Sequence, residues 1–517
     1  MRPALPILAI ASAFLLFSAA TLDDFGLTWD EGVKMYDDAS YADVVGRIAP
    51  HDPRVLHIPG YFYVADTLRS LYAKAVRDAF AADPVLVHHS FNVLLSTACL
   101  VLLHGLTLAV SGSRRLAATA AVALALLPQF VGHSQNNPKD LPAAVVFLAV
   151  AWAVVAASRR PGAGRVLGAA ALFGVALTTR VSALLLPVIL GAWLWLRRRD
   201  VLAREVRWIA VGGAASLAFA ALCFPALWVH GPGVFAEAAR GLDVLRGLDV
   251  EVLYLGELHR WTGLPWHFSA VHLLATLPPA HLVLLLAAVP ALRDRDEEER
   301  GKADAGWLAL LWVLALFGAD LFAPLHYDGI RHLLAALPAV ALLAACGAEW
   351  CFAWLERRGR RRTALALAGL AVCATTLELA VMHPYQTAYL NPVARAFAGD
   401  RPEEWIEVEY WGAPYKEGSA WLDRHAEPHA VVHFVIGGGQ RAGEDVARYY
   451  LDRRVVRGGN LRIFQDTGTP QYLIFITRKA WYDEFVRDVR ARYEPVFTVE
   501  RGGATLLEIY SNRAGAG

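Results

Sequence analysis

Two adjacent carboxylates, Asp30 and Glu31, closely follow the first long apolar run of the chain, in the stretch GLTWDEGVKMYDD (26–38). A carboxylate can act as a general base and take the proton of a hydroxyl group as its oxygen forms a new bond. The same residues could also be solvated loop carboxylates, or acids in the first turn of an interfacial helix. Their position beside an apolar segment makes them the first candidates for chemistry in this chain.

Basic residues at the ends of other apolar runs could bind an anion. Fixed Arg and Lys side chains stabilise negative charge that develops on a departing phosphate. The candidates are Lys139, Arg180 and Arg331, and we favour Arg331 because HYDGIRH (326–332) places several polar groups beside a helix start. The two arginines could instead anchor helix ends. Lys139 could form a surface ion pair with its neighbour Asp140, which would contribute little to stability.

Asp140 precedes the fourth apolar run and is the second acidic candidate. An Asp at this position can also cap the following helix, and the two roles are compatible. Further polar and aromatic residues near these segments are expected to line a substrate cavity: Asn137, Tyr327, Asp328, His326, His332, Trp261, Trp266, His383 and Tyr385. The two Trp could equally belong to an aromatic belt at the membrane interface. The His residues match no standard metal-ligand spacing, so we expect no metal.

The elements that must position these residues are apolar. The chain has 517 residues, of which 56% are hydrophobic, and this exceeds the usual share in soluble proteins. A membrane-spanning helix needs about 20 mostly apolar residues. Eleven such runs lie near 3–20, 86–110, 116–132, 141–158, 166–178, 181–196, 208–229, 267–292, 306–324, 333–354 and 363–382. We therefore expect a mostly α-helical, polytopic membrane protein with about eleven transmembrane helices.

Two of these assignments have alternatives. The first run could be a cleaved signal peptide, although the many later runs favour an uncleaved helix. The runs at 166–178 and 181–196 are short and are divided by TTR (178–180), so they could be two helices or one kinked helix.

Lys and Arg concentrate in alternate short loops, which predicts a cytoplasmic N-terminus. The polar candidates then all fall on the opposite, outer side, beginning with a first outer loop at about 21–85. Ionisable residues at the ends of apolar helices cost free energy unless they are solvated or take part in function. Their gathering on one side predicts an active cavity at the outer leaflet.

The composition changes after residue 382. Short β-like runs lie at 430–437, 471–477, 495–500 and 505–510, with amphipathic helical patterns at 441–452 and 479–493. We therefore predict two domains, a membrane domain at 1–382 and a small extracytoplasmic α/β domain at 383–517. The five Cys all lie in or beside apolar runs, so no disulfide framework is expected.

The order of these motifs resembles glycosyltransferase family 39. The carboxylate pair is followed by NNPKD (136–140), GVALTTR (174–180), YDGIRHLLAALP (327–338), HPYQTAYLNP (383–392) and EYWG (409–412). This family includes the dolichyl-phosphate-mannose protein mannosyltransferases and the lipid A aminoarabinose transferases, which belong to the membrane-embedded GT-C class. The resemblance covers the membrane region and is to a bacterial branch, without the MIR domain of many eukaryotic members.

The resemblance implies an enzyme that takes a sugar from a polyprenyl-phosphate donor at the outer leaflet. It passes the sugar to a hydroxyl of a protein or lipid acceptor and inverts the anomeric centre. The resemblance implies that Asp30 is the general base, with Glu31 beside it, and that Asp140 is the second acid. It also implies a bacterial inner-membrane protein with a periplasmic C-terminal domain, contact with membrane lipids, no cofactor besides the donor, and no nucleic-acid partner.

Three other functions stay open from the sequence. A lipid or solute transporter would hold ionisable residues near the bilayer midplane, often on broken helices. A polysaccharide ligase or polymerase would use a pyrophosphate-linked oligosaccharide in place of a polyprenyl-phosphate sugar. A membrane scaffold without catalytic activity would use the outer domain to bind a partner.

Overall fold

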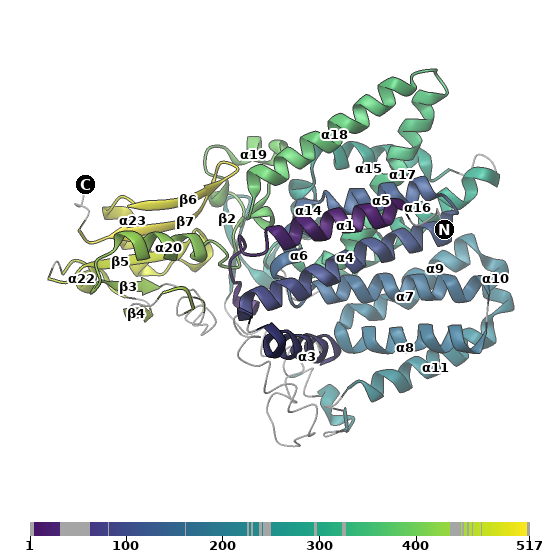
Figure 1. Cartoon of the computed structure of the whole chain (residues 1–517), viewed down its shortest axis with the longest axis horizontal. Coiled ribbons are helices and arrows are strands. Elements are labelled where there is room, and N and C mark those ends of the chain that lie inside the picture. The colour runs from purple at the N-terminus through teal and green to yellow at the C-terminus, as the bar shows by residue number, and fades with distance from the viewer. Residues whose placement is uncertain are drawn as a thin grey trace.

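A computed structural model gives the fold of the chain (Figure 1). The structure describes residues 5–31, 63–80, 82–160, 162–224, 227–228, 231–236, 240, 250–293, 297–322, 327–434, 446, 449–451, 454–457, 459–466 and 468–513.

The N-terminal three quarters of the chain form a bundle of apolar helices. Its first half consists of α1 (Leu5–Ala20), α3 (Tyr63–Phe80), α4 (Pro84–Ser111), α5 (Arg114–Ala125), α6 (Pro128–Asn136), α7 (Leu141–Arg159), α8 (Ala163–Thr179), α9 (Leu186–Arg197), α10 (Arg199–Arg204) and α11 (Val206–Leu222). The second half consists of α14 (Phe268–Thr276), α15 (Pro279–Ala291), α16 (Glu297–Asp320), the 3₁₀ helix η3 (Arg331–Ala336), α17 (Leu337–Glu356) and α18 (Arg361–Met382).

Helix α17 lies at the centre of the bundle. All of its first eleven residues are buried, and four of them are Ala, which lets neighbouring helices approach closely. Gly347 marks the closest approach, because a Cβ at this position would stand 1.9 Å from the backbone oxygen of Leu284 in α15. The small residues of the LPAVALLAACGAEW stretch thus position α15 against α17.

The predicted number of eleven spans is wrong. Among the described residues, five helices are long and apolar enough to cross a membrane, namely α4, α7, α16, η3 with α17, and α18. The count reaches seven if the bent pairs α5–α6 (67°) and α14–α15 (115°) each form one span. The other four predicted runs form helices of 10–17 residues, which are shorter than the roughly 20 residues that a full crossing needs.

Residues 166–196 form two helices. Helix α8 ends at Thr179, Arg180 is extended (φ −155°, ψ 139°), and a short 3₁₀ turn, η1 (Val181–Leu185), leads into α9. The break falls at the TTR sequence (178–180), so Arg180 lies between the end of α8 and the start of η1.

The C-terminal part contains a five-stranded sheet in the order β4-β3-β5-β7-β6. The strands are β3 (Val431–Phe434), β4 (Arg454–Arg457), β5 (Gln471–Ile476), β6 (Phe497–Arg501) and β7 (Ala504–Ser511). Strand β3 pairs in parallel with β4 and β5, and β7 pairs antiparallel with β5 and β6. The four predicted strands are present, and β4 is an addition. The helical pattern predicted at 441–452 lies mostly outside the described residues.

Helices cover both faces of this sheet. Alternate side chains of a strand point to opposite faces. Ile474 of β5 packs in one core with α20 (Tyr415–His425), whereas its neighbour Leu473 packs in another core with α23 (Glu484–Arg492). The remaining short elements are α19 (Pro392–Ala398), α22 (Leu461–Phe464), and the 3₁₀ helices η2 (Trp261–Gly263), η4 (Gln386–Ala388), η5 (Pro402–Glu404) and η7 (Lys479–Trp481).

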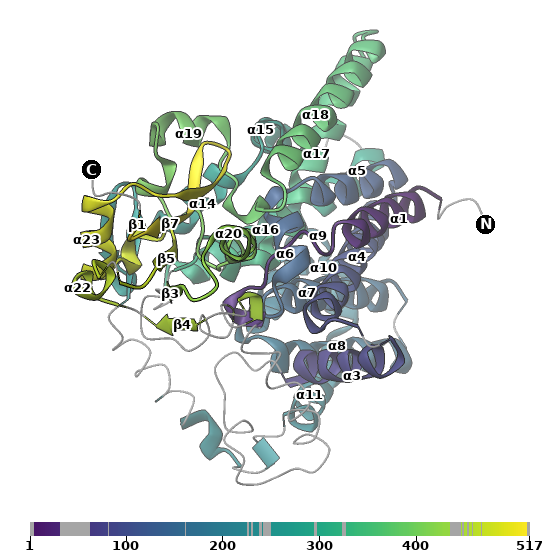
Figure 2. The ribbon, with the colours of Figure 1, turned by 60° about the vertical axis from the view of Figure 1, so that its left-hand side comes forward.

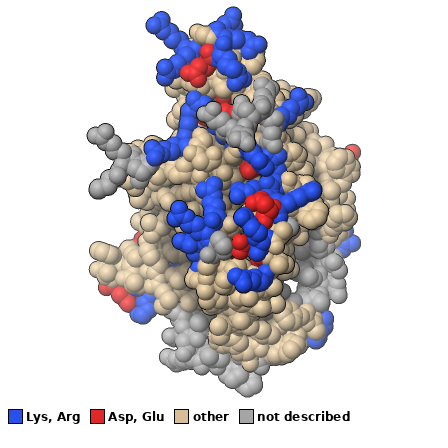
Figure 3. All heavy atoms as spheres, turned by 90° about the vertical axis from the view of Figure 1, so that its right-hand side faces the viewer, with Lys and Arg blue, Asp and Glu red and all other residues tan. Residues whose placement is uncertain are grey.

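The sheet lies at one end of the helix bundle, and the hairpin β1 (Glu251–Tyr254)–β2 (Glu257–Arg260) lies beside it (Figures 1 and 2). One hydrophobic core joins these parts, since Trp29 after the first helix, Tyr254 of the hairpin and Ile474 of the sheet belong to it. The opposite end of the bundle is rich in Lys and Arg (Figure 3). The predicted domain limits at 382/383 and the predicted membrane orientation stay predictions.

Candidate active site

The segment that carries Asp30 is held against the chain that precedes α20. The indole nitrogen of Trp29 donates to the backbone oxygen of Tyr410 at 2.7 Å, and its backbone N–H donates to Trp411 at 3.2 Å. Gly412 has φ +88°, and a Cβ there would stand 2.7 Å from the Trp29 ring. Only a glycine lets the two segments pack this closely, and this packing positions the neighbouring Asp30.

Both carboxylate oxygens of Asp30 accept from cations. Lys139 donates to Oδ1 at 2.6 Å and Arg331 donates to Oδ2 at 2.6 Å. Burial alone would raise the pKa of Asp30, but the attraction of Lys139 and Arg331 outweighs it and holds the pKa well below its usual range. Asp30 is therefore ionised at neutral pH.

Asp140 lies in the same cluster and is almost fully buried. It occupies the N-cap position of α7, yet its side chain makes no capping hydrogen bond. Its carboxylate instead pairs with Arg180 and accepts from Asn137 at 3.1 Å, while the Arg331 guanidinium lies 3.9 Å away. Arg331 thus stands between the two acids that the sequence singled out.

Arg331 contacts several residues of this cluster. Besides Asp30, it pairs with Asp328 at 2.8 Å. Its guanidinium carbon lies 5.3 Å from the ring centre of Tyr327 and 5.4 Å from that of Trp411, which is within cation–π range. These contacts hold the guanidinium plane in one orientation.

Arg180 links the cluster to the start of η3. Its second terminal nitrogen lies 2.7 Å from Nδ1 of His332, whose ring stands 4.7 Å from that of Tyr327. The break between α8 and α9 therefore places the Arg180 side chain next to the YDGIRH segment (327–332).

A third arginine, Arg478, reaches the cluster from the C-terminal part of the chain. It follows β5, is 2% exposed, and lies 2.8 Å from the Oδ1 of Asp328. Its guanidinium also binds both oxygens of Glu407, at 3.2 and 3.1 Å. Burial, only partly offset by Arg478, raises the pKa of Glu407.

The described part of the cluster contains four carboxylates and four cations that contact one another. They are Asp30, Asp140, Asp328, Glu407, Lys139, Arg180, Arg331 and Arg478. Among the described residues, no three His, Cys, Asp or Glu side chains are grouped so that they could hold a metal ion. The chemistry that this arrangement supports is proton transfer to a carboxylate next to cations that can bind a phosphate.

Glu31 points away from Asp30. It is fully buried, and its carboxylate contacts Thr28 and Nε2 of His89 in α4, the latter at 3.3 Å. Its surroundings are those of a residue that holds the loop to α4.

The other predicted residues divide into those near the cluster and those apart from it. Trp261 is buried with its ring centre 5.4 Å from that of Tyr327, whereas Trp266 is 77% exposed. His383 pairs with Asp24, and Tyr385 donates to Glu417, so these two lie in a separate network. His326 lies outside the described residues.

Sequence reasoning missed Arg478, Glu407 and His89 as neighbours of the site. Arg478 directly follows an apolar strand, and a charged residue at this point was a usable signal. Trp411 belongs to the EYWG motif noted in the sequence, but its contact with Arg331 depends on how distant segments pack.

No protein-family model and no curated protein sequence matches the chain. Solved structures, however, do match the chain. The oligosaccharyltransferase of Archaeoglobus fulgidus in its apo form gives a TM-score of 0.50 at 13% identity, and the alignment covers 98% of this chain and 74% of the other. The same values hold for Archaeoglobus fulgidus AglB in complex with an inhibitory peptide and a dolichol-phosphate.

The chain has the GT-C glycosyltransferase fold. Together with the apolar helices, this fold makes it a multi-pass membrane protein. A third structure, the mycobacterial arabinofuranosyltransferase AftD, aligns with a TM-score of 0.45 at 13% identity over 99% of this chain and 40% of the other. At 13% identity, the likeness to the two Archaeoglobus fulgidus structures shows the GT-C fold alone and does not establish the activity.

Proposed function

We propose that this protein is a membrane glycosyltransferase of the family 39 type. It transfers a sugar from a polyprenyl-phosphate donor to a hydroxyl of a protein or lipid acceptor, with inversion, at the outer face of a bacterial inner membrane. The observation that carries the proposal is the pair of acids, Asp30 and Asp140, on either side of Arg331 at one end of a GT-C bundle.

The proposed reaction uses the cluster as follows. Asp30 takes the proton of the acceptor hydroxyl while that oxygen attacks the anomeric carbon from the face opposite the phosphate. The bond between this carbon and the phosphate oxygen breaks, and its electron pair leaves on the polyprenyl phosphate. Arg331, Lys139 and Arg180 stabilise the phosphate charge.

Donor binding would also activate the base. In the structure, Lys139 and Arg331 hold the pKa of Asp30 low, which makes it a weak base. A donor phosphate that draws these cations toward itself weakens their attraction for the carboxylate. The pKa of Asp30 then rises toward the range in which a carboxylate accepts a proton more readily.

The experiment compares the lipids of a deletion strain complemented with the wild-type protein, with Asp30→Asn, or with Asp23→Asn. Asp23 is the matched control, because it is a carboxylate of the same segment with an 84% exposed side chain. We expect a polyprenyl-phosphate sugar to accumulate in the deletion strain and with Asp30→Asn, and to be cleared by the other two. Mass spectrometry of lipid extracts gives the mass of the sugar.

Two results would oppose the proposal. Accumulation of a pyrophosphate-linked oligosaccharide would indicate a ligase or polymerase. Wild-type lipids with a well-expressed Asp30→Asn protein would show that Asp30 is not the base.

A further inference from the structure

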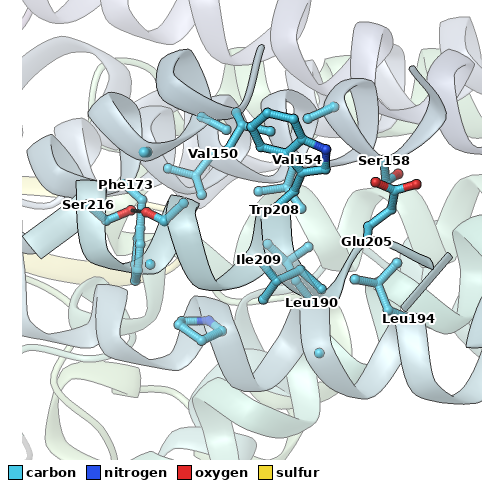
Figure 4. A pocket seen from close by; sticks show the side chains of 18 of the residues that line it. Val150, Val154, Ser158, Phe173, Leu190, Leu194, Glu205, Trp208, Ile209 and Ser216 are labelled. Carbon is cyan, nitrogen blue, oxygen red and sulfur yellow. Dashed lines mark hydrogen bonds between the residues drawn. The ribbon is translucent and has the colours of Figure 1, made fainter. Parts of the chain in front are cut away.

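An apolar cavity lies between α7, α8, α9 and α11, away from the acidic cluster (Figure 4). Its volume is about 270 Å³, and its walls include Val154, Phe173, Leu190 and Trp208. The residues of the acidic cluster do not line it. The cavity is thus a separate feature of the described bundle.

The polarity of this cavity is uneven along its length. Ser158 and Glu205 lie next to each other at one end, while Phe173 and Ser216 lie at the other (Figure 4). The end with Glu205 adjoins the loops after α7 and α9. The two segments 158–165 and 197–207 contain eight Arg and two acidic residues.

These arginines are remote from the active-site cluster. Helix α7 begins beside Asp140 and ends at Arg159, and its 19 residues span about 28 Å at 1.5 Å per residue. Lys and Arg gather on the face at that far end of the bundle (Figure 3). The guanidinium of Arg207 lies 5.6 Å from the ring of Trp208, a residue of the cavity wall.

Two glycines leave space in the cavity. Gly191 of α9 and Gly213 of α11 both line it, and a Cβ built on either would have no heavy atom within 4 Å. A Cβ at either position would therefore stand in open space beside the cavity and meet no backbone of another helix.

We propose that this cavity binds one acyl chain of an anionic phospholipid. The phosphate of this lipid lies among the arginines at the Glu205 end of the cavity, and Arg207 is its main partner. An acyl chain in the cavity gains van der Waals contacts with the apolar walls, and guanidinium groups are strong partners for phosphate. Anionic lipid headgroups attract basic residues at a membrane surface. The cavity and its arginines are independent of the proposed glycosyl transfer, whereas the exclusion of the polyprenyl-phosphate donor as its occupant rests on it.

A polyprenyl-phosphate donor fits this cavity less well than an anionic phospholipid does. Its phosphate would bind at Arg331, at the other end of α7, where the acids of the active site lie. The arginines at the Glu205 end of the cavity would then bind no lipid phosphate. The arginine-rich end therefore favours a lipid whose headgroup lies on that side.

The test is a native mass-spectrometry titration of the full-length protein in detergent, with phosphatidylglycerol and phosphatidylcholine of identical acyl chains. We expect the wild type to bind one phosphatidylglycerol at least tenfold more tightly than phosphatidylcholine. The double substitution Gly191→Leu and Gly213→Leu fills the cavity and should weaken phosphatidylglycerol binding at least tenfold. Gly168→Leu is the matched control, because a Cβ at Gly168 also meets nothing within 4 Å but Gly168 does not line the cavity.

A second variant tests the headgroup independently of the cavity. Arg207→Gln should reduce the preference for phosphatidylglycerol several-fold while the binding of phosphatidylcholine is unchanged. Equal binding of the two lipids by the wild type, or unchanged phosphatidylglycerol binding by both Arg207→Gln and the filled variant, would overturn the proposal. Displacement of phosphatidylglycerol by an equimolar polyprenyl phosphate would also overturn it, because the donor would then be the occupant.

Discussion

Arg478 lies 2.8 Å from Asp328, so a residue that follows strand β5 of the C-terminal sheet contacts the segment that carries Arg331. Asp328 uses its other oxygen to bind Arg331, which in turn binds Asp30. Charges of alternating sign therefore connect the C-terminal sheet to the proposed base. The backbone of Asp328 is in the left-handed region (φ +56°), and the two buried ion pairs stabilise this conformation.

Replacing Arg478 with Gln should destabilise the protein by about 3–5 kcal/mol, because it leaves Glu407 buried without its cation and removes one of the two cations that bind Asp328. Chemical unfolding of the purified protein in detergent micelles measures this change. The control is Arg424→Gln, which changes an exposed arginine of α20 and should alter the unfolding free energy by less than about 0.5 kcal/mol. Equal stability of the two variants would contradict the role of Arg478.

Arg331→Lys should lower kcat/KM by about 10² or more, since the loss of one preorganised donor to a developing anion has about this effect in other enzymes. A lysine has one compact charge and cannot reproduce the planar guanidinium that contacts Asp30 and Asp328 together. Assays with a polyprenyl-phosphate sugar measure the change. Arg395→Lys is a suitable control, because Arg395 donates to Gly502 outside the cluster and its substitution should leave kcat/KM near wild type.

Glu31→Gln separates the two adjacent acids. Glu31 is buried against His89 and Thr28 and does not contact Lys139 or Arg331 in the structure. The variant should keep kcat within a few-fold of wild type and lose about 1–3 kcal/mol of stability through weaker buried hydrogen bonds. Asp30→Asn should instead lose about 10²–10⁴ in kcat, the usual contribution of a general base. A kcat for Glu31→Gln as low as that of Asp30→Asn would mean that both acids take part in proton transfer.

Glu409 makes stability depend on pH. Burial, partly offset by the backbone N–H groups of Trp411 and Gly412, raises its pKa from 4.5 to about 7. Between these values the native state binds more protons than the unfolded state, so stability falls as the pH rises from about 4.5 to 7.

Glu409→Gln should remove this dependence, because its amide oxygen can still accept both backbone hydrogen bonds. Below pH 4.5 the variant and the wild type should be equally stable with respect to this group. Above pH 7 the variant should be more stable by about 3 kcal/mol, at about 1.4 kcal/mol for each pH unit. Unfolding curves at pH 4.5, 6 and 8 test this, and a constant difference at all three values would contradict the prediction.

Several parts of the site could be predicted because local sequence controls them. Asp30, Asp140, Arg180 and Arg331 each stand where an apolar run begins or ends, and charged residues at such places are visible without a structure. The strands at 471–477 and 505–510 were predictable for a related reason. Their continuous apolar and β-branched residues form buried strands, and the Gly502–Gly503 turn has positive φ at both positions.

The number of membrane-crossing helices could not be predicted from hydropathy. Composition identified eleven apolar runs, but it did not show that α5–α6 and α14–α15 bend by 67° and 115° or that four helices stop at 17 residues or fewer. Helix ends and bends depend on packing against neighbouring helices, and an apolar run contains little information about them.

The sequence by itself determined which residue types are available at the ends of the helices, and it indicated a sheet after residue 382. Only the tertiary structure decided that Arg331 stands between Asp30 and Asp140, that Glu31 turns toward His89, and that Arg478 joins the cluster. The physical reason is that these contacts join residues separated by up to about 300 positions, as for Asp30 and Arg331. Spacing along the chain says nothing about such pairs, because the packing of α4, α7, α17 and the C-terminal sheet brings them together.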